Sequence, residues 1–150
     1  MPLDAIDLKL LEVLQVRGRT TRNDLAASVG FSLPSVSERL RKLEQSGYIT
    51  GYHATLDPKK VGRDVCAFIT VSVDSSKHYA GFIERAHANE EILECHATTG
   101  EGSHLLKVRT ADTLSLESLL ARIQTWPGVV KTRTDLVLST AKETTRLKIG

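Results

Sequence analysis

Residues 20–49, TTRNDLAASVGFSLPSVSERLRKLEQSGYI, constrain the fold of this chain more than any other stretch. Thr21 can cap a short helix, and Gly30 can close it because glycine tolerates a positive φ. Either Ser32 or Ser35 can cap the helix that follows, and the second serine also fits a capping box. The stretch therefore predicts two short helices joined by a tight turn.

An amphipathic helix and a hairpin-like segment flank these two helices. Asp4 can cap the preceding helix, which carries apolar residues at helical spacing and ends at residues 17–19. Residues 48–56 follow the last helix at once and have the pattern of a hairpin. Three helices and a hairpin in this order predict a winged helix-turn-helix, a fold that places one helix in the DNA major groove.

The third helix offers a polar face for DNA. At about 100° per residue, Val36, Leu40 and Leu43 share a narrow arc and should pack on the other helices. The opposite side carries hydrogen-bonding groups and cations, which suit base edges and phosphates. A charged outer face is normal for any amphipathic helix, so only its combination with the flanking elements favours DNA binding. Arg39 lies nearer the buried side and should brace the fold or reach a phosphate. The candidate DNA-binding residues are Thr21, Arg22, Ser32, Ser35, Ser37, Glu38, Arg39, Arg41 and Lys42.

After a linker turn at residues 57–60 the hydrophobic period changes to that of strands. We expect strands over 65–73, 92–98, 105–109 and 129–138, with helices over 77–88 and from Asp112 onward. In the first of these helices Phe82, Ile83 and Ala86 should point inward. The order β-α-β-β-α-β predicts a ferredoxin-like αβ sandwich. The chain is therefore an α+β protein with domains at 1–60 and 61–150, and the uncovered sheet face calls for a second subunit.

The charge of the chain is weak for a nucleic-acid binder. Its net charge is +2: residues 1–60 hold nine Lys/Arg and seven Asp/Glu, and residues 61–150 hold eleven of each. We therefore expect oligomerisation to multiply the contacts with DNA. No apolar run of about eighteen residues suggests a membrane span. The N-terminus lacks a basic n-region and there are two cysteines, so a cytoplasmic protein is expected.

Four segments of the chain together resemble the Lrp/AsnC family, the feast/famine transcription regulators. They run in the family's order and cover almost the whole chain, and the second is the most specific. The segments are LDAIDLKLLEVLQ, DLAASVGFSLPSVSERLRKLEQSGYITGYHATLDPKKVG, TTGEGSHLLKVRTAD and WPGVVKTRTDLVLSTAKETTRLKI.

The resemblance implies a DNA-binding winged helix-turn-helix followed by a ligand-sensing αβ sandwich. It implies homodimers through the sandwiches, commonly assembled into octamers, with double-stranded DNA as partner. It also implies small effectors, usually amino acids, that bind between sandwiches and alter assembly or DNA affinity. The implied effector-binding residues are Gly100, Glu101, Gly102, Ser103, His104, Thr132 and Thr134.

The effector turn departs from the family pattern at two positions. Ser103 stands where the pattern has an acid, and Gly102 stands where a bulky or aromatic residue is usual. A carboxylate there would suit a ligand ammonium group through a charge-assisted hydrogen bond. The sequence therefore leaves open whether the effector is a standard α-amino acid. Glu101 could supply the missing carboxylate from a different position in the turn.

Other classes of function find less support. Cys66, Cys95, His96 and His104 could approach one another in a sheet, but their spacing matches no common metal motif. No phosphate loop, nucleophile elbow or His/Glu metal motif is present, so we expect neither an enzyme nor a cofactor. An architectural DNA-binding protein without an effector response is the alternative, because the altered turn would fit it.

Overall fold

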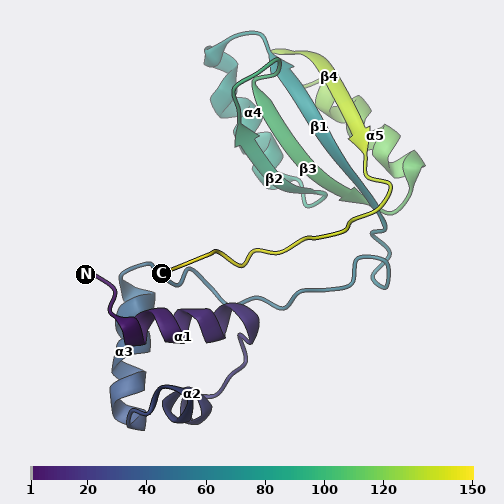
Figure 1. Cartoon of the computed structure of the whole chain (residues 1–150). Coiled ribbons are helices and arrows are strands. Elements are labelled where there is room, and N and C mark those ends of the chain that lie inside the picture. The colour runs from purple at the N-terminus through teal and green to yellow at the C-terminus, as the bar shows by residue number, and fades with distance from the viewer. Residues whose placement is uncertain (1) are drawn as a thin grey trace. The chain divides into compact units, whose positions relative to one another are not determined.

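The computed structural model describes residues 2–150, which form two units (Figure 1). The helical unit consists of residues up to Thr55 together with Lys142–Gly150, and the sheet unit consists of Leu56–Ala141. The sequence had suggested a boundary after residue 60, with the C-terminal segment in the second domain. The C-terminal segment instead groups with the helices, where the Gln15 side chain hydrogen-bonds to the backbone of Leu147.

The helical unit contains the three predicted helices, α1 (Ala5–Val16), α2 (Arg22–Val29) and α3 (Leu33–Gln45). Asp4 caps α1 through a reciprocal pair of hydrogen bonds with Asp7, and Thr21 caps α2. Gly30 ends α2 with φ at 73°, in the left-handed region that glycine adopts at little cost. Ser32, rather than Ser35, caps α3, so the second of the two alternatives is excluded.

An ion-pair cluster joins α3 to the start of α1. The Arg39 guanidinium lies 2.7 Å from an Asp4 oxygen and 3.0 Å from an Asp7 oxygen, and it also lies over the Phe31 ring. These hydrogen bonds, to Asp4 first and then Asp7, raise the pKa of Arg39. Beneath the cluster Leu10 and other apolar side chains of the three helices form one buried core.

The hairpin expected at residues 48–56 is wrong: these residues contain no strand. The segment packs back on α3 instead, with the Ile49 N–H donating to the Leu43 carbonyl and the Tyr52 hydroxyl donating to Glu44 at 2.9 Å. Burial, followed by this hydrogen bond, raises the pKa of Tyr52 to about 12. A two-stranded hairpin is marginal by itself, and these contacts with the helix compete with it.

The sheet unit has the predicted ferredoxin-like order. Its strands are antiparallel and lie in the order β2-β3-β1-β4, and a 3₁₀ turn, Ser76–His78, precedes α4. The last strand ends two residues earlier than expected. The elements are β1 (Val65–Val73), α4 (Tyr79–Ala88), β2 (Ile92–Ala97), β3 (His104–Thr110), α5 (Thr113–Gln124) and β4 (Val129–Leu136).

Both helices cover one face of this sheet (Figure 1). Phe82 and Ala86 of α4 are buried as predicted, and Leu119 and Ile123 of α5 are buried as well. The inward prediction for Ile83 is wrong, because its side chain is 47% exposed. Successive residues of a helix are rotated by about 100°. Because Phe82 lies on the narrow buried side of α4, Ile83 points away from it.

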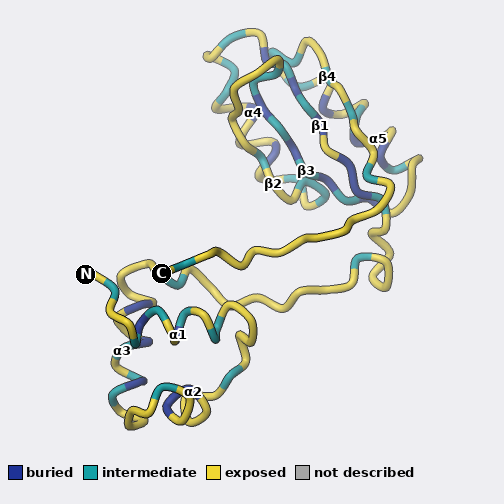
Figure 2. Tube along the Cα trace, in the orientation of Figure 1, coloured by how far each residue is buried: buried dark blue, intermediate teal, exposed yellow. Residues whose placement is uncertain are grey.

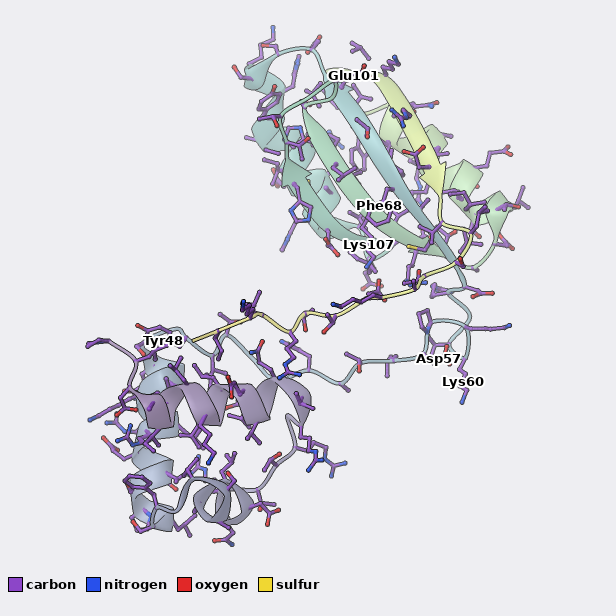
Figure 3. The ribbon with its side chains drawn as sticks, in the orientation of Figure 1. Tyr48, Asp57, Lys60, Phe68, Glu101 and Lys107 are labelled. Atoms are coloured by element: carbon purple, nitrogen blue, oxygen red, sulfur yellow. The ribbon has the colours of Figure 1, made fainter. Side chains whose placement is uncertain are left out.

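The opposite face of the sheet is open in the single chain. Its central residue, Phe68, is 36% exposed and lies opposite Lys107 in the register of β1 and β3 (Figure 3). Cys66, Thr70 and Ser72 share this face because side chains alternate along a strand. Within the described residues no helix has the length and apolar character to cross a membrane.

Candidate DNA-binding and effector sites

The outward face of α3 is organised around Arg41. Its Nε donates to Glu38 at 2.8 Å, and its Nη1 donates to Gln45 at 2.6 Å. The hydrogen bond from Arg41 lowers the pKa of Glu38 below its usual range. Gln45 was not among the predicted site residues, although its spacing of four from Arg41 places it one helical turn away. The guanidinium has five N–H donors, and the exposed Arg41 side chain keeps two of them beyond the three that bind Glu38 and Gln45.

The remaining predicted DNA-binding residues divide into three groups. Lys42 is exposed beside Arg41, and Ser35 and Ser37 are half-buried on the flanks of the same helix. Thr21 and Ser32 are helix caps whose hydroxyls accept backbone N–H groups, and Arg22 is the exposed first residue of α2. Arg39 is held by two carboxylates, so it braces the fold. The structure thus gathers Glu38, Arg41 and Lys42 on one exposed face.

This face carries almost no net charge. Glu38 and Glu44 offset Arg41 and Lys42, and Arg39 is offset by Asp4 and Asp7. The face therefore offers hydrogen-bonding groups for base edges but little attraction for phosphates. Because phosphate contacts dominate the affinity of proteins for DNA, this face by itself would bind DNA weakly.

The predicted effector turn is packed tightly against β1. A Cβ on Gly102 would lie 2.3 Å from Cγ2 of Thr70 and 3.1 Å from the Val71 carbonyl oxygen, so only glycine fits this backbone. The Ser103 hydroxyl accepts the Val73 N–H at 3.0 Å and lies 3.2 Å from the Val71 carbonyl. The serine therefore stabilises the join between turn and sheet. Glu101 is exposed at the tip (Figure 3).

His104 follows the turn but points into the core. It is 1% exposed, and its ring lies 4.8 Å from the rings of both Tyr79 and Phe82. Its Nδ1 is 2.9 Å from the Ser103 hydroxyl, and its Nε2 has no hydrogen-bond partner among the described residues. Burial lowers the pKa of His104, because an apolar environment disfavours the imidazolium. The ring is therefore neutral at pH 7.

Thr132 and Thr134 lie on β4, on the far side of β1 from the turn. Thr132 stands opposite Val71, and its hydroxyl accepts the Gln124 amide at 3.0 Å. The sequence analysis did not single out Gln124, because it is the last residue of a helix for which only packing on the sheet was expected. The single chain brings Ser103 and His104 together, while β1 separates them from the two threonines.

The cysteines and histidines considered for a metal do not converge. Cys66 lies on the open face of the sheet, whereas Cys95 packs on the side covered by helices. Burial raises the pKa of the Cys95 thiol, which keeps it protonated. His96 is exposed and interacts with Glu94 at 2.9 Å. Across the described part of the chain no three His, Cys, Asp or Glu side chains are grouped for a metal ion.

Two known families account for the two units. The winged helix-turn-helix DNA-binding family matches residues 3–50, and the Lrp/AsnC ligand-binding domain matches residues 66–147. The chain therefore carries a DNA-binding domain and a ligand-binding domain in the order expected from its sequence.

Curated relatives and a solved structure agree along nearly the full length. The HTH-type transcriptional regulator FL11 of Pyrococcus horikoshii is 37% identical over 99% of this chain and 98% of its own. The leucine-responsive regulatory protein of Haemophilus influenzae is 37% identical over 95% of this chain and 87% of its own. A Neisseria meningitidis transcriptional regulator in complex with L-Met has a TM-score of 0.94 and 33% identity, over 98% of this chain and 97% of that one. This chain belongs to the Lrp/AsnC family of transcriptional regulators.

Proposed function

We propose that this chain is a sequence-specific regulator of transcription whose DNA affinity or assembly is modulated by a small effector. The observation that carries the proposal is the union of a helix-turn-helix with a ligand-binding domain in one chain. Relatives named for leucine response and a similar structure containing L-Met favour an amino acid or a related metabolite as the effector. The chain would act by binding rather than catalysis, in the cytoplasm where its DNA target lies.

The proposed assembly is a homodimer formed through the open face of the sheet, with octamers as the larger form. Phe68 exposes more than a third of its surface at the centre of this face, whereas its neighbours in β1, Ala67 and Ile69, are fully buried on the other face. A two-fold pair of chains would hold two α3 helices in register with half-sites about one helical turn of DNA apart.

Replacing Arg41 or Lys42 with alanine should weaken DNA binding without unfolding the helical unit. Both side chains are exposed, so their removal costs little packing. Each loss should cost about 1–3 kcal/mol if the side chain reads a base, or act equally on all sequences if it meets only phosphate. Binding curves on promoter and random DNA at physiological salt would separate the two cases.

The matched control is Lys9→Ala, which removes an exposed cation from α1 of the same unit. It should retain near-normal affinity. Unchanged binding in both α3 variants would remove this helix from the interface. Equal wild-type affinity for promoter and random DNA would contradict sequence-specific regulation itself.

Titration with the twenty amino acids should identify a ligand that changes the assembly of the full chain. Calorimetry would report binding, and light scattering would report the change in oligomer size. Thr132→Val should weaken this response, because it removes a β4 hydroxyl that the family resemblance assigns to the effector site. Thr113→Val removes an exposed hydroxyl at the start of α5 and should leave the response unchanged. A complete lack of response to all twenty would favour the architectural DNA-binding alternative.

A further inference from the structure

The C-terminal segment 142–150 lies along α1 of the helical unit. Leu147 uses both of its backbone groups there: its N–H donates to the Gln15 side-chain oxygen at 2.6 Å, and its carbonyl accepts the Gln15 amide at 3.0 Å. A carboxamide has the same donor and acceptor as a peptide group, so Gln15 binds the segment as a neighbouring strand would. This clasp joins residues 132 positions apart in the chain.

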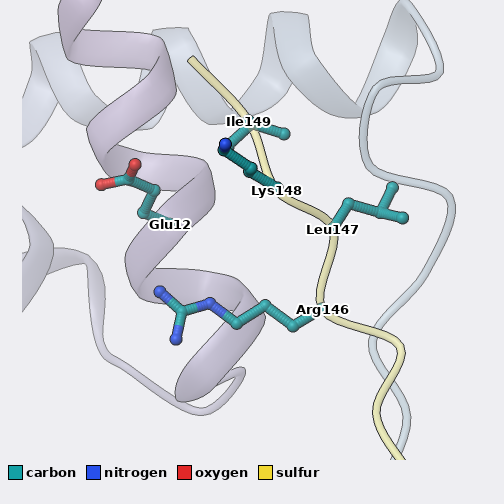
Figure 4. A pocket seen from close by; sticks show the side chains of 5 residues that line it. All are labelled: Glu12, Arg146, Leu147, Lys148 and Ile149. Carbon is teal, nitrogen blue, oxygen red and sulfur yellow. The ribbon is translucent and has the colours of Figure 1, made fainter.

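Cations of the segment line a groove with α1. The groove has a volume of about 260 Å³ and is lined by Glu12 together with Arg146, Leu147, Lys148 and Ile149 (Figure 4). Arg146 and Lys148 are exposed, whereas Ile149 is half-buried. The segment is otherwise exposed almost throughout (Figure 2). Arg146 and Lys148 are thus held on the helical unit by the backbone contacts of Leu147 and remain accessible.

The segment decides the charge of the unit that binds DNA. Residues 1–55 hold seven Lys/Arg and six Asp/Glu, a net charge of +1, and residues 142–150 hold three Lys/Arg and one Asp/Glu, a net charge of +2. The unit therefore has a net charge of +3, and two of these three charges come from the C-terminal segment. Lys59 and Lys60, which follow the helix-turn-helix in sequence, belong to the sheet unit.

We propose that segment 142–150 is a second DNA-contacting element of the helical unit, which Gln15 holds in place and whose cations bind the phosphate backbone. The inference rests on the proposed DNA-binding function. It explains how α3, the proposed reading helix, gains affinity for a polyanion although its outward face carries almost no net charge. Phosphate contacts of this kind strengthen binding to every sequence and add no base preference.

The test compares two double variants of the full chain that each lose two charges. Arg146→Gln with Lys148→Gln should weaken binding to specific and random DNA by the same factor. The slope of log Kobs against log salt should become shallower by about 1 for each lost contact, and by up to about 4 for a dimer. Lys59→Gln with Lys60→Gln is the control, because it removes exposed cations from the sheet unit.

A smaller loss of slope in the control than in the C-terminal variant supports the proposal. Equal slopes and affinities in the two variants overturn it, since net charge alone would then explain the effect. Unchanged binding in the C-terminal variant also overturns it, provided that Arg41→Ala still weakens binding. A wild-type chain that binds no DNA would instead contradict the proposed function.

Gln15→Met tests whether the clasp positions these cations. The substitution keeps the length of the side chain and the charge of the protein but removes both hydrogen bonds to Leu147. Hydrogen exchange in residues 142–150 should accelerate, and the salt slope should fall in the direction seen for the C-terminal variant. Faster exchange with unchanged DNA binding would overturn the role of Gln15.

Discussion

Leu40→Ala should unfold the helical unit and abolish DNA binding while the sheet unit stays folded. Leu40 is 4% exposed and packs with Leu10, Leu25 and Val36 in the only apolar cluster described for these helices. Truncation of a buried leucine costs about 2–5 kcal/mol. Small domains have little stability to lose, so this cost is comparable with the whole free energy of unfolding of the unit.

Hydrogen exchange would check this expectation unit by unit. Peptides from α1 to α3 should exchange quickly in the variant, and peptides from β1 to β4 should remain protected. Leu33→Ala is the matched control, because the same change on the same helix removes a side chain that is 42% exposed. If DNA binding survives Leu40→Ala at full strength, the three-helix core does not support the reading helix.

Phe82→Ala should destabilise the sheet unit and leave the helical unit folded. The Phe82 ring is 1% exposed and lies 4.8 Å from the His104 ring and 5.6 Å from the Trp126 ring, so it joins α4 to β3 and to the turn that follows α5. Its removal should cost the sheet unit about 3–5 kcal/mol. The proposed dimer should dissociate, and DNA affinity should fall because the two reading helices are no longer held together.

Denaturant unfolding and light scattering would measure these two effects. Ile83→Ala, one residue further along α4, provides the control because that side chain is 47% exposed. It should change the free energy of unfolding by less than about 1 kcal/mol. Equal destabilisation by both substitutions would mean that α4 packs differently from the arrangement described here.

The elements that carry local signals were predictable from the sequence. Asp4, Thr21 and Ser32 cap helices because a short polar side chain can accept the free N–H groups of a first turn. β1 was predictable because its apolar residues alternate on the side that the helices cover. These signals involve residues that are neighbours in the sequence, so they can be recognised without the structure.

Contacts between distant segments were not predictable in the same way. The clasp between Gln15 and Leu147 depends on where the chain returns after β4, and no nearby residue records that path. The hairpin expected over 48–56 failed for a similar reason, because the competing contacts of Ile49 and Tyr52 are made with α3. Local pattern and tertiary contact disagreed there, and the tertiary contact prevailed.

The candidate sites show the same division. The outward position of Arg41 and Lys42 followed from helical periodicity alone. The sequence could not show that Arg41 is already engaged by Glu38 and Gln45, because several rotamers would satisfy the same spacing. Nor could it show that the Ser103 hydroxyl is used by the sheet, since that depends on the register of β1 against β3.

The contact between Gly102 and Thr70 means that substitutions at these two positions depend on each other. A bulky side chain introduced at Gly102 would collide with Thr70 and with the β1 backbone behind it. Trimming Thr70 to glycine or alanine clears only the first of these obstacles. Variants that enlarge only position 102 would therefore distort the sheet, whereas a larger side chain there requires both a smaller residue at position 70 and a shift of the turn away from β1.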